Sequence, residues 1–253
     1  MHLRPLSVSD LPAAASLVAD AMRDDEIWQY LCPARMEYYS HYRDSFLRRM
    51  KLRLSKPGWV TYVAVTDADD EGEPISSHGG GKIVGYAAWE RDGNSPAARK
   101  WRGKNDTFGC WIERFLQGIE GYYIDFFNLD KSVDKFNLAT YLSATEGSFP
   151  SKIYPELWYL STLAVHPSYQ RRGIGTKLVE WGMEQARMEK VPVGLEPSIK
   201  GTGLYEKLGF RTISKSEWIE GQWVSAMLWE PPIEGAVEGP AREEEDRSVT
   251  KES

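Results

Sequence analysis

A turn in the C-terminal half of the chain combines residue types that can hold an anion. It runs through Gln170, Arg171, Arg172, Gly173, Ile174, Gly175 and Thr176. The two glycines let the main chain approach a ligand without a Cβ in the way, and the two arginines can add charge-assisted hydrogen bonds. Apolar residues recur at helical spacing after the turn, so it opens a helix whose N-terminal N–H groups and dipole attract negative charge. We therefore expect this turn to bind a pyrophosphate.

The turn lacks the marks of two common nucleotide-binding motifs. A P-loop needs a lysine followed by serine or threonine in a fixed frame, and a dinucleotide fingerprint needs a third glycine. Neither is present here, so ATP and NAD are poor candidates. An isolated Gly-x-Gly pair is also common in turns that bind nothing. The segments on either side of it must therefore show whether this turn binds a ligand.

Those segments complete a pattern of three blocks. Residues 156–165 have the composition of a strand, which ends where Pro167 turns the chain. Beyond the predicted helix, a short strand at 193–196 leads to a short helix around Tyr205, and Gly209 stops that helix. The three blocks are Leu163-Ala164-Val165-His166-Pro167, Gln170 to Gly175, and Leu204-Tyr205-Glu206-Lys207-Leu208-Gly209-Phe210.

In this order and at these separations, the blocks resemble the GNAT family of N-acetyltransferases. The resemblance is close over residues 157–213. It fits residues 1–91 as the opening strand, helices and hairpin of the family, and it does not extend to 92–150. It implies an α/β fold, with a central mixed, mostly antiparallel twisted sheet flanked by helices.

The resemblance also implies a binding site for acetyl-CoA. Main-chain groups of Leu163, Ala164 and Val165 would bind the pantetheine arm in the manner of strand addition. Amides of Arg171, Arg172, Gly173, Ile174, Gly175 and Thr176, with Gln170 beside them, would hold the pyrophosphate. A bulge in the strand would splay it from the next strand and leave a slot for the thioester.

For catalysis, the family pattern assigns two residues directly. The N–H of Leu163 would stabilise the oxyanion, and Tyr205 would protonate the departing thiolate. Ser198 stands where the family often has asparagine, so a serine hydroxyl would have to bond the pantetheine or orient Tyr205.

The group that takes the proton of the acceptor is harder to assign. Some relatives place histidine or glutamate on the strand before the turn, where this chain has Tyr159 and the candidate catalytic residue Ser161. Neither is a good base at neutral pH, so we expect water to carry the proton outwards. Glu156 and Glu196 are the alternatives, and His166 is interpreted as a turn residue.

Composition limits the other possibilities. The net charge of −6 argues against nucleic-acid binding, and Cys32 and Cys110 lack the spacing of a metal site. No stretch is long enough to span a membrane and no signal peptide is visible, so a cytoplasmic protein is the default expectation. We expect one domain over residues 1–231, in which 92–150 forms a helical insertion that covers the acceptor site. Residues 232–253 are predicted to form a disordered tail.

Local patterns predict the remaining elements. Strands are expected at 3–6, 59–65, 83–89 and 223–229, with helices at 13–22 and 36–54. Ser9 or Asp10 would cap the first helix. A long acidic, Gly-rich loop at 67–81 would join the strands at 59–65 and 83–89.

The function implied by the resemblance is direct transfer of the acetyl group of acetyl-CoA to a primary amine of a small molecule, within a ternary complex. The protein would be a monomer or homodimer without a metal. Two alternatives stay open. One is acetylation of a protein or peptide, at its N-terminus or at lysine, and the other is a non-catalytic acyl-CoA-binding module. Acyl groups longer than acetyl also stay possible.

Overall fold

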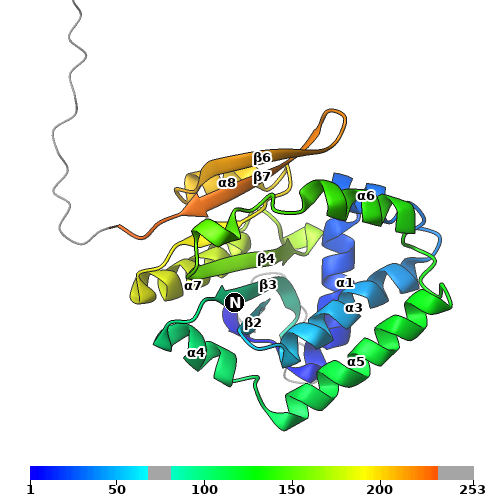
Figure 1. The fold of residues 1–253 in the computed structure, drawn as a ribbon, viewed down its shortest axis with the longest axis horizontal. Coiled ribbons are helices and arrows are strands. Elements are labelled where there is room, and N and C mark those ends of the chain that lie inside the picture. Colours follow the sequence, from blue (N-terminus) through cyan, green and yellow to red (C-terminus); the bar gives the residue numbers. More distant parts are fainter. Residues whose placement is uncertain (68–80, 233–253) are drawn as a thin grey trace, which may run out of the picture.

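The computed structural model describes residues 1–67 and 81–232, which include one seven-stranded sheet (Figure 1). Its strands, in chain order, are β1 (His2–Pro5), β2 (Trp59–Val65), β3 (Ile83–Asp92), β4 (Leu157–Val165), β5 (Val193–Leu195), β6 (Arg211–Ile219) and β7 (Gln222–Trp229). The spatial order is β1-β2-β3-β4-β5-β7-β6, and β4–β5 is the parallel pair among antiparallel ones. The predicted fold class is confirmed.

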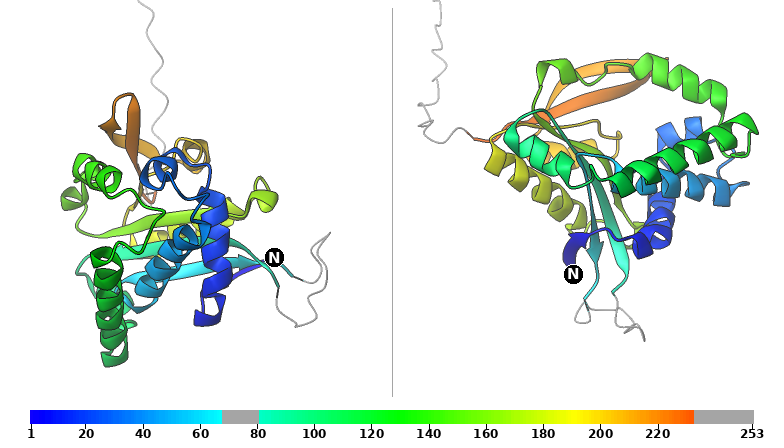
Figure 2. Two further views of the ribbon diagram at one scale, coloured as in Figure 1. Left: turned by 90° about the vertical axis from the view of Figure 1, so that its right-hand side faces the viewer. Right: turned by 60° about the horizontal axis from the view of Figure 1, so that its bottom comes forward.

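Helices cover both faces of this sheet (Figure 2). They are α1 (Leu11–Met22), α2 (Glu26–Leu31), α3 (Tyr39–Ser55), α4 (Pro96–Gly103), α5 (Phe108–Phe126), α6 (Lys135–Thr145), α7 (Ile174–Glu189) and α8 (Thr202–Lys207). Three short 3-10 turns, Val8–Asp10, Ser151–Ile153 and Pro167–Tyr169, complete the described elements. Alternate residues of β2 and β3 face opposite sides, so one core forms under α7 and a second under α1 and α3.

A glycine in α7 allows the helix to pack directly on the sheet. A Cβ at Gly182 would come within 2.3 Å of the Trp89 ring in β3. Trp89 is itself fully buried and packs edge-to-face on Trp158 of β4. Since α7 follows the Gly-rich turn directly, this packing fixes where the turn sits against β4.

A buried ion-pair network marks the start of the insertion. Arg91, at the end of β3, is 0% exposed and binds Glu156 and Glu189, each at 2.6 Å. Glu156 also accepts hydrogen bonds from the backbone N–H groups of Asn94 and Ser95. Ser95 in turn caps α4 by accepting from Ala98 N–H. Glu156 is therefore a structural group of this network, which removes it as a candidate base.

The insertion at 92–150 contains α4, α5 and α6, as the sequence indicated. Helix α5 lies against α3 (Figure 1), yet none of its residues is buried. Its large apolar side chains that are more than half exposed are Phe108, Trp111, Phe115, Leu116, Ile119, Tyr122, Tyr123 and Phe126. Helix α6 packs instead against α2 and β6.

Two local expectations need correction. The predicted helix at 36–54 forms as α3, but α2 precedes it and was not foreseen. The side chain of Asp10 does not cap α1; Ser7 and Asp10 form a capping box around the 3-10 turn, and the Asp10 carboxylate binds Arg4. The predicted tail, from 233 onward, and most of the predicted loop, from 68 to 80, lie outside the described residues. Within 1–67 and 81–232, no helix has the length and hydropathy of a bilayer span.

Candidate functional site

Strand β4 separates from its neighbour β5 halfway along its length. Leu160 still pairs with Leu195, but β5 ends there, and no residue of β5 pairs with 161–165. On the other side, Ala88 pairs with Thr162 and Trp89 pairs with Leu160, so Ser161 is the extra residue of a bulge. The expected bulge is present, and no described strand pairs with β4 beyond Leu160 on the β5 side, beside Leu163, Ala164 and Val165.

The Gly-rich turn leads from β4 into α7 with free donors. Gly173 is the N-cap residue of α7 with φ +77°, and Arg171 also has a positive φ of 61°. Lys177 N–H donates to the Gly173 carbonyl at 3.1 Å, but the backbone N–H groups of 171–176 find no acceptor among the described residues. The turn therefore offers a row of unpaired amides at a helix N-terminus, where an anion is favoured.

Neighbouring side chains support that use of the turn. The side chains of Arg171 and Arg172 are exposed, so both can reach a phosphate. Arg172 lies over the Tyr169 ring at 5.1 Å, and Lys82 lies over the same ring at 4.9 Å. Gln170 folds back instead, donating from Nε2 to the Val165 carbonyl at 3.2 Å. Gln170 thus ties the turn to the end of β4.

A cavity of about 420 Å³ adjoins the bulge. Residues 159–163 of β4 form one wall, and Ser198, Leu204 and Tyr205 form another. Helices α2 and α3 contribute further residues, and α6 contributes Leu138, Tyr141 and Leu142. Of the insertion, α6 is thus the helix that lines the cavity, whereas α5 contributes no residue to it. The volume lies within the range of small-molecule sites.

Tyr205 and Ser198 meet at this cavity without bonding each other. Tyr205 is 6% exposed, and burial raises the pKa of its hydroxyl above the ordinary tyrosine range, so it stays protonated at neutral pH. No described residue hydrogen-bonds its hydroxyl. The Ser198 carbonyl accepts from Gly201 and Thr202 N–H and so holds the start of α8. The Ser198 hydroxyl is free of partners in the described part of the chain, and an orienting bond to Tyr205 is absent.

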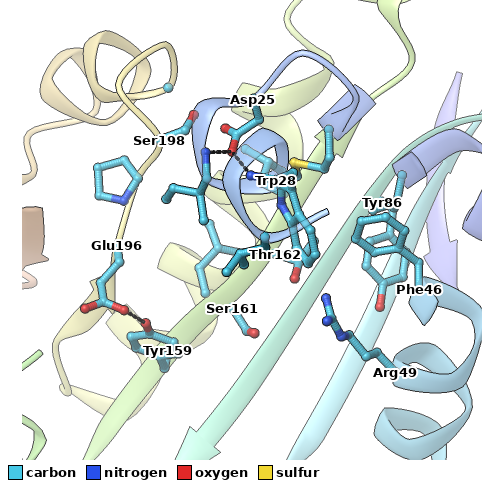
Figure 3. Close-up of a pocket in the computed structure, with 18 of the residues that line it drawn as sticks. Asp25, Trp28, Phe46, Arg49, Tyr86, Tyr159, Ser161, Thr162, Glu196 and Ser198 are labelled. Carbon is cyan, nitrogen blue, oxygen red and sulfur yellow. Dashed lines mark hydrogen bonds between the residues drawn. The ribbon is translucent and has the colours of Figure 1, made fainter. Parts of the chain in front are cut away.

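Charged side chains stand on two sides of the cavity, and Figure 3 shows Glu196 and Arg49 facing each other across it. Glu196 follows β5 and accepts hydrogen bonds from Tyr159 Oη at 2.9 Å and from the Ser148 hydroxyl. Burial, and then the Glu196 carboxylate, raise the pKa of Tyr159 well above its usual value. Tyr159 is therefore a neutral donor that holds Glu196.

On the α3 side, Arg53 organises the bulge. It donates to Ser161 Oγ from Nη2 at 2.9 Å and to Tyr86 Oη from Nη1 at 3.5 Å. Because Arg53 only donates, Ser161 must accept from it, and the serine O–H is left to donate into the cavity. Ser161 is thus held in a fixed position by a cation.

Sequence reasoning did not foresee the part played by helices α2 and α3. Asp25, Trp28, Arg49 and Arg53 line the cavity, although no motif marks them. The one available signal was the run of arginines and aromatics at 36–54, which indicates an amphipathic helix but not which face meets a ligand. His166 is confirmed as a turn residue, since its ring accepts from Ser168 N–H at the start of the 3-10 turn.

Comparisons with known proteins relate this chain to acetyltransferases. The family described as acetyltransferase (GNAT) domain matches residues 138–212. An acetyltransferase from Stachybotrys chartarum is 27% identical over 214 residues, covering 84% of this chain and 81% of that protein. An uncharacterized N-acetyltransferase from Bacillus pumilus is 35% identical over 78 residues, covering 31% of this chain and 44% of its own.

A solved structure shares the fold. It is described as histone acetyltransferase HPA2 and related acetyltransferase from Corynebacterium glutamicum, and it is 21% identical with a TM-score of 0.54. The match covers 93% of this chain and 98% of the other. At this identity, the likeness shows a common architecture.

Proposed function

Because this chain carries a GNAT acetyltransferase domain and is an acetyltransferase of that kind, we propose that it transfers the acetyl group of acetyl-CoA to a primary amine of a small molecule. The observation that supports this most is a cavity that is lined both by the β4 bulge and by residues of α6. Bound acetyl-CoA would supply an activated thioester at that bulge.

The turn after β4 and the second half of β4 would bind different parts of acetyl-CoA. The unpaired amides of 171–176, with Arg171 and Arg172, fit two linked phosphates. The main chain of Leu163, Ala164 and Val165, free of β5, fits an extended pantetheine arm. The residues present thus fit the cofactor that the fold implies.

Three groups would serve the chemistry itself. The N–H of Leu163 would stabilise negative charge on the carbonyl oxygen, and the Ser161 hydroxyl, oriented by Arg53, would donate beside it. Tyr205 would give its proton to the leaving sulfur, which its raised pKa permits across the physiological range. The amine proton would leave through water, with Glu196 as the carboxylate on that side of the cavity.

A small acceptor suits the site better than a peptide. A peptide lies in an open groove, whereas α2, α3, α6 and β4 all contribute walls here. Acetylation of a protein N-terminus or lysine is therefore the second candidate. We further propose that residues 1–231 act as one domain in which 92–150 supplies part of the acceptor site.

The Tyr205→Phe variant distinguishes an enzyme from a non-catalytic acyl-CoA-binding module. The variant should bind acetyl-CoA with unchanged affinity by calorimetry, because the ring is kept. It should lose about 100-fold in kcat across a panel of amines, followed as release of CoA thiol, since the acid is gone. Unchanged turnover would remove Tyr205 from the mechanism, and an absence of acetyl-CoA binding by the wild-type protein would end the proposal.

A further inference from the structure

Arg49 of α3 is a cation in the cavity without an anionic partner. The structure gives it no hydrogen bond and no ion pair to any described residue. Its guanidinium lies over the rings of Trp28 at 4.7 Å and Phe46 at 5.6 Å, and it lines the cavity. Figure 3 shows the guanidinium directed into the space opposite Glu196.

The surroundings of Arg49 do not compensate its charge. Arg48 binds Asp130 at 2.7 Å on another side of α3, and Arg53 is a second cation. Burial raises the pKa of the Cys32 thiol to about 11, so this neighbour is neutral at physiological pH. Burial and Arg53 lower the pKa of Arg49, but an arginine keeps its proton in proteins. Arg49 is half-buried, and a charge partly withdrawn from water without a counter-charge is costly unless a ligand supplies the missing anion.

The opposite wall has the reverse polarity. Glu196 carries a negative charge and is held by two hydroxyl donors, Tyr159 and Ser148. Asp25 also lines the cavity, but its carboxylate accepts the N–H groups of Ile27 and Trp28 as the cap of α2. Trp28, Phe46 and Tyr141 add aromatic surface to the lining of the cavity.

We propose that the acceptor is an amine that also carries a carboxylate, with the carboxylate bound by Arg49 and the amine on the side of Glu196. This specificity rests on the proposed acetyltransferase function and narrows its substrate class. Arginine suits the role because its planar fork matches a carboxylate with two parallel hydrogen bonds.

The anion expected to bind Arg49 is not a phosphate of acetyl-CoA. The unpaired amides for those phosphates lie in the turn at 171–176, and no residue of that turn lines the cavity. Arg49 instead stands on α3, the same helix whose Arg53 holds Ser161 at the bulge. The missing anion therefore belongs to the acceptor.

The test compares acceptors that differ only in the carboxylate. Phenylalanine is paired with phenylalaninamide and 2-phenylethylamine, and 6-aminohexanoate is paired with hexylamine, so that α- and ω-amino acids are both covered. For at least one pair, the wild-type protein should prefer the carboxylate-bearing amine in kcat/KM. In Arg49→Gln this preference should fall by about 10- to 100-fold, mainly through KM, as expected for loss of a charge-assisted hydrogen bond.

Arg43→Gln is the matched control. Arg43 lies on the same helix, pairs with its neighbour Asp44 and does not line the cavity. Its acceptor preference should equal that of the wild type. Arg49→Lys should recover part of the preference, which a purely structural role would not predict. Thermal melting confirms that each variant is folded.

A binding measurement separates this inference from the proposed function. The N-acetylated products are titrated into the CoA complex by calorimetry, which needs no turnover. Tighter binding of the carboxylate-bearing product, lost in Arg49→Gln, supports the inference even if every amine on the panel is inert. The inference is overturned if the wild type and Arg49→Gln show the same preference for carboxylate-bearing compounds, both in turnover and in product binding. Turnover of the amines without a carboxylate would still support the proposed function.

Discussion

Gly173 sets the geometry of the anion-binding turn. Its φ of +77° lies in the left-handed region, where a side chain is strained, and a Cβ there would meet nothing within 4 Å. The constraint is therefore conformational and not steric. Because Gly173 directly precedes α7, its conformation decides whether the N–H groups of 171–176 point outwards together.

Gly173→Ala should weaken CoA binding while leaving the fold intact. The left-handed conformation costs an alanine about 1 kcal/mol, so the affinity for CoA should fall about fivefold in a calorimetric titration. Gly103→Ala is the control, since Gly103 also has open space around it, lies at the end of α4 and has no positive φ. Equal affinities in the two variants would show that the conformation of the turn does not matter for binding.

At the scale of elements, the network around Arg91 joins β3, β4, α4 and α7. Arg91 binds Glu189 of α7 and Glu156 before β4, and Glu156 holds the turn that leads into α4. Burial by itself would raise the pKa of Glu156, but hydrogen bonds from Ser95, Asn94 and Arg91 outweigh it and lower the pKa to about 2.

This depressed pKa predicts an acid-sensitive contribution to stability. The folded protein binds a proton at Glu156 less readily than the unfolded chain does, so the contribution is complete above the ordinary pKa of 4.5. It is lost as the pH falls from there towards 2. Glu156→Gln should therefore lower the free energy of unfolding by about 1–3 kcal/mol at pH 7, and this deficit should shrink below pH 4 in urea melts.

Glu180→Gln serves as the control for this prediction. Glu180 lies exposed on α7 and forms no hydrogen bond or ion pair with residues 1–67 or 81–232. Its substitution should leave the unfolding free energy unchanged at both pH values. A deficit in Glu156→Gln that is the same at pH 7 and at pH 3 would contradict the assignment.

At the scale of the whole molecule, α5 is the feature that a monomer does not explain. Three of its exposed rings stack in sequence, Phe108 on Trp111 and Trp111 on Phe115. The rings of α5 that are more than half exposed are Phe108, Trp111, Phe115, Tyr122, Tyr123 and Phe126. At about 200 Å² per whole aromatic side chain, these rings leave roughly 750 Å² of apolar surface. That exceeds the usual patch on a monomer and matches one side of a standard protein interface.

Between the two oligomeric states expected from the sequence, this surface favours a homodimer. Helix α5 carries Glu113, Glu120 and Asp125 against the single cation Arg114, unlike the basic helices that lie on membranes. A second copy of α5 across a two-fold axis would cover the same patch on both chains.

Light scattering after size exclusion should thus give twice the chain mass of 28.8 kDa. Phe115→Ser combined with Tyr122→Ser should return the protein to a monomer. Val8→Ser, at an exposed position outside α5, should not change the mass. A wild-type protein that stays monomeric on concentration would exclude this interface.

The sequence by itself determined the elements whose signals are local. The strand at 59–65 forms as predicted because aromatic and β-branched residues favour an extended chain. The glycines and arginines of the turn predicted an anion-binding helix start, because its backbone geometry depends on residues close together in the chain. The bulge at Ser161 was implied by the resemblance of residues 157–213 to the GNAT family. The helical nature of the insertion was likewise predictable, but not which of its helices would line the cavity.

Only the tertiary structure decided what surrounds the reacting groups. Arg49 and Glu196 stand on α3 and after β5, and nothing in either segment indicates that they face one cavity. Packing also moved Glu156 from candidate base to partner of Arg91. The physical reason is common to these cases: a motif fixes backbone geometry over a few residues, whereas the charge balance of a cavity depends on side chains from distant segments that meet only when the sheet and its helices pack.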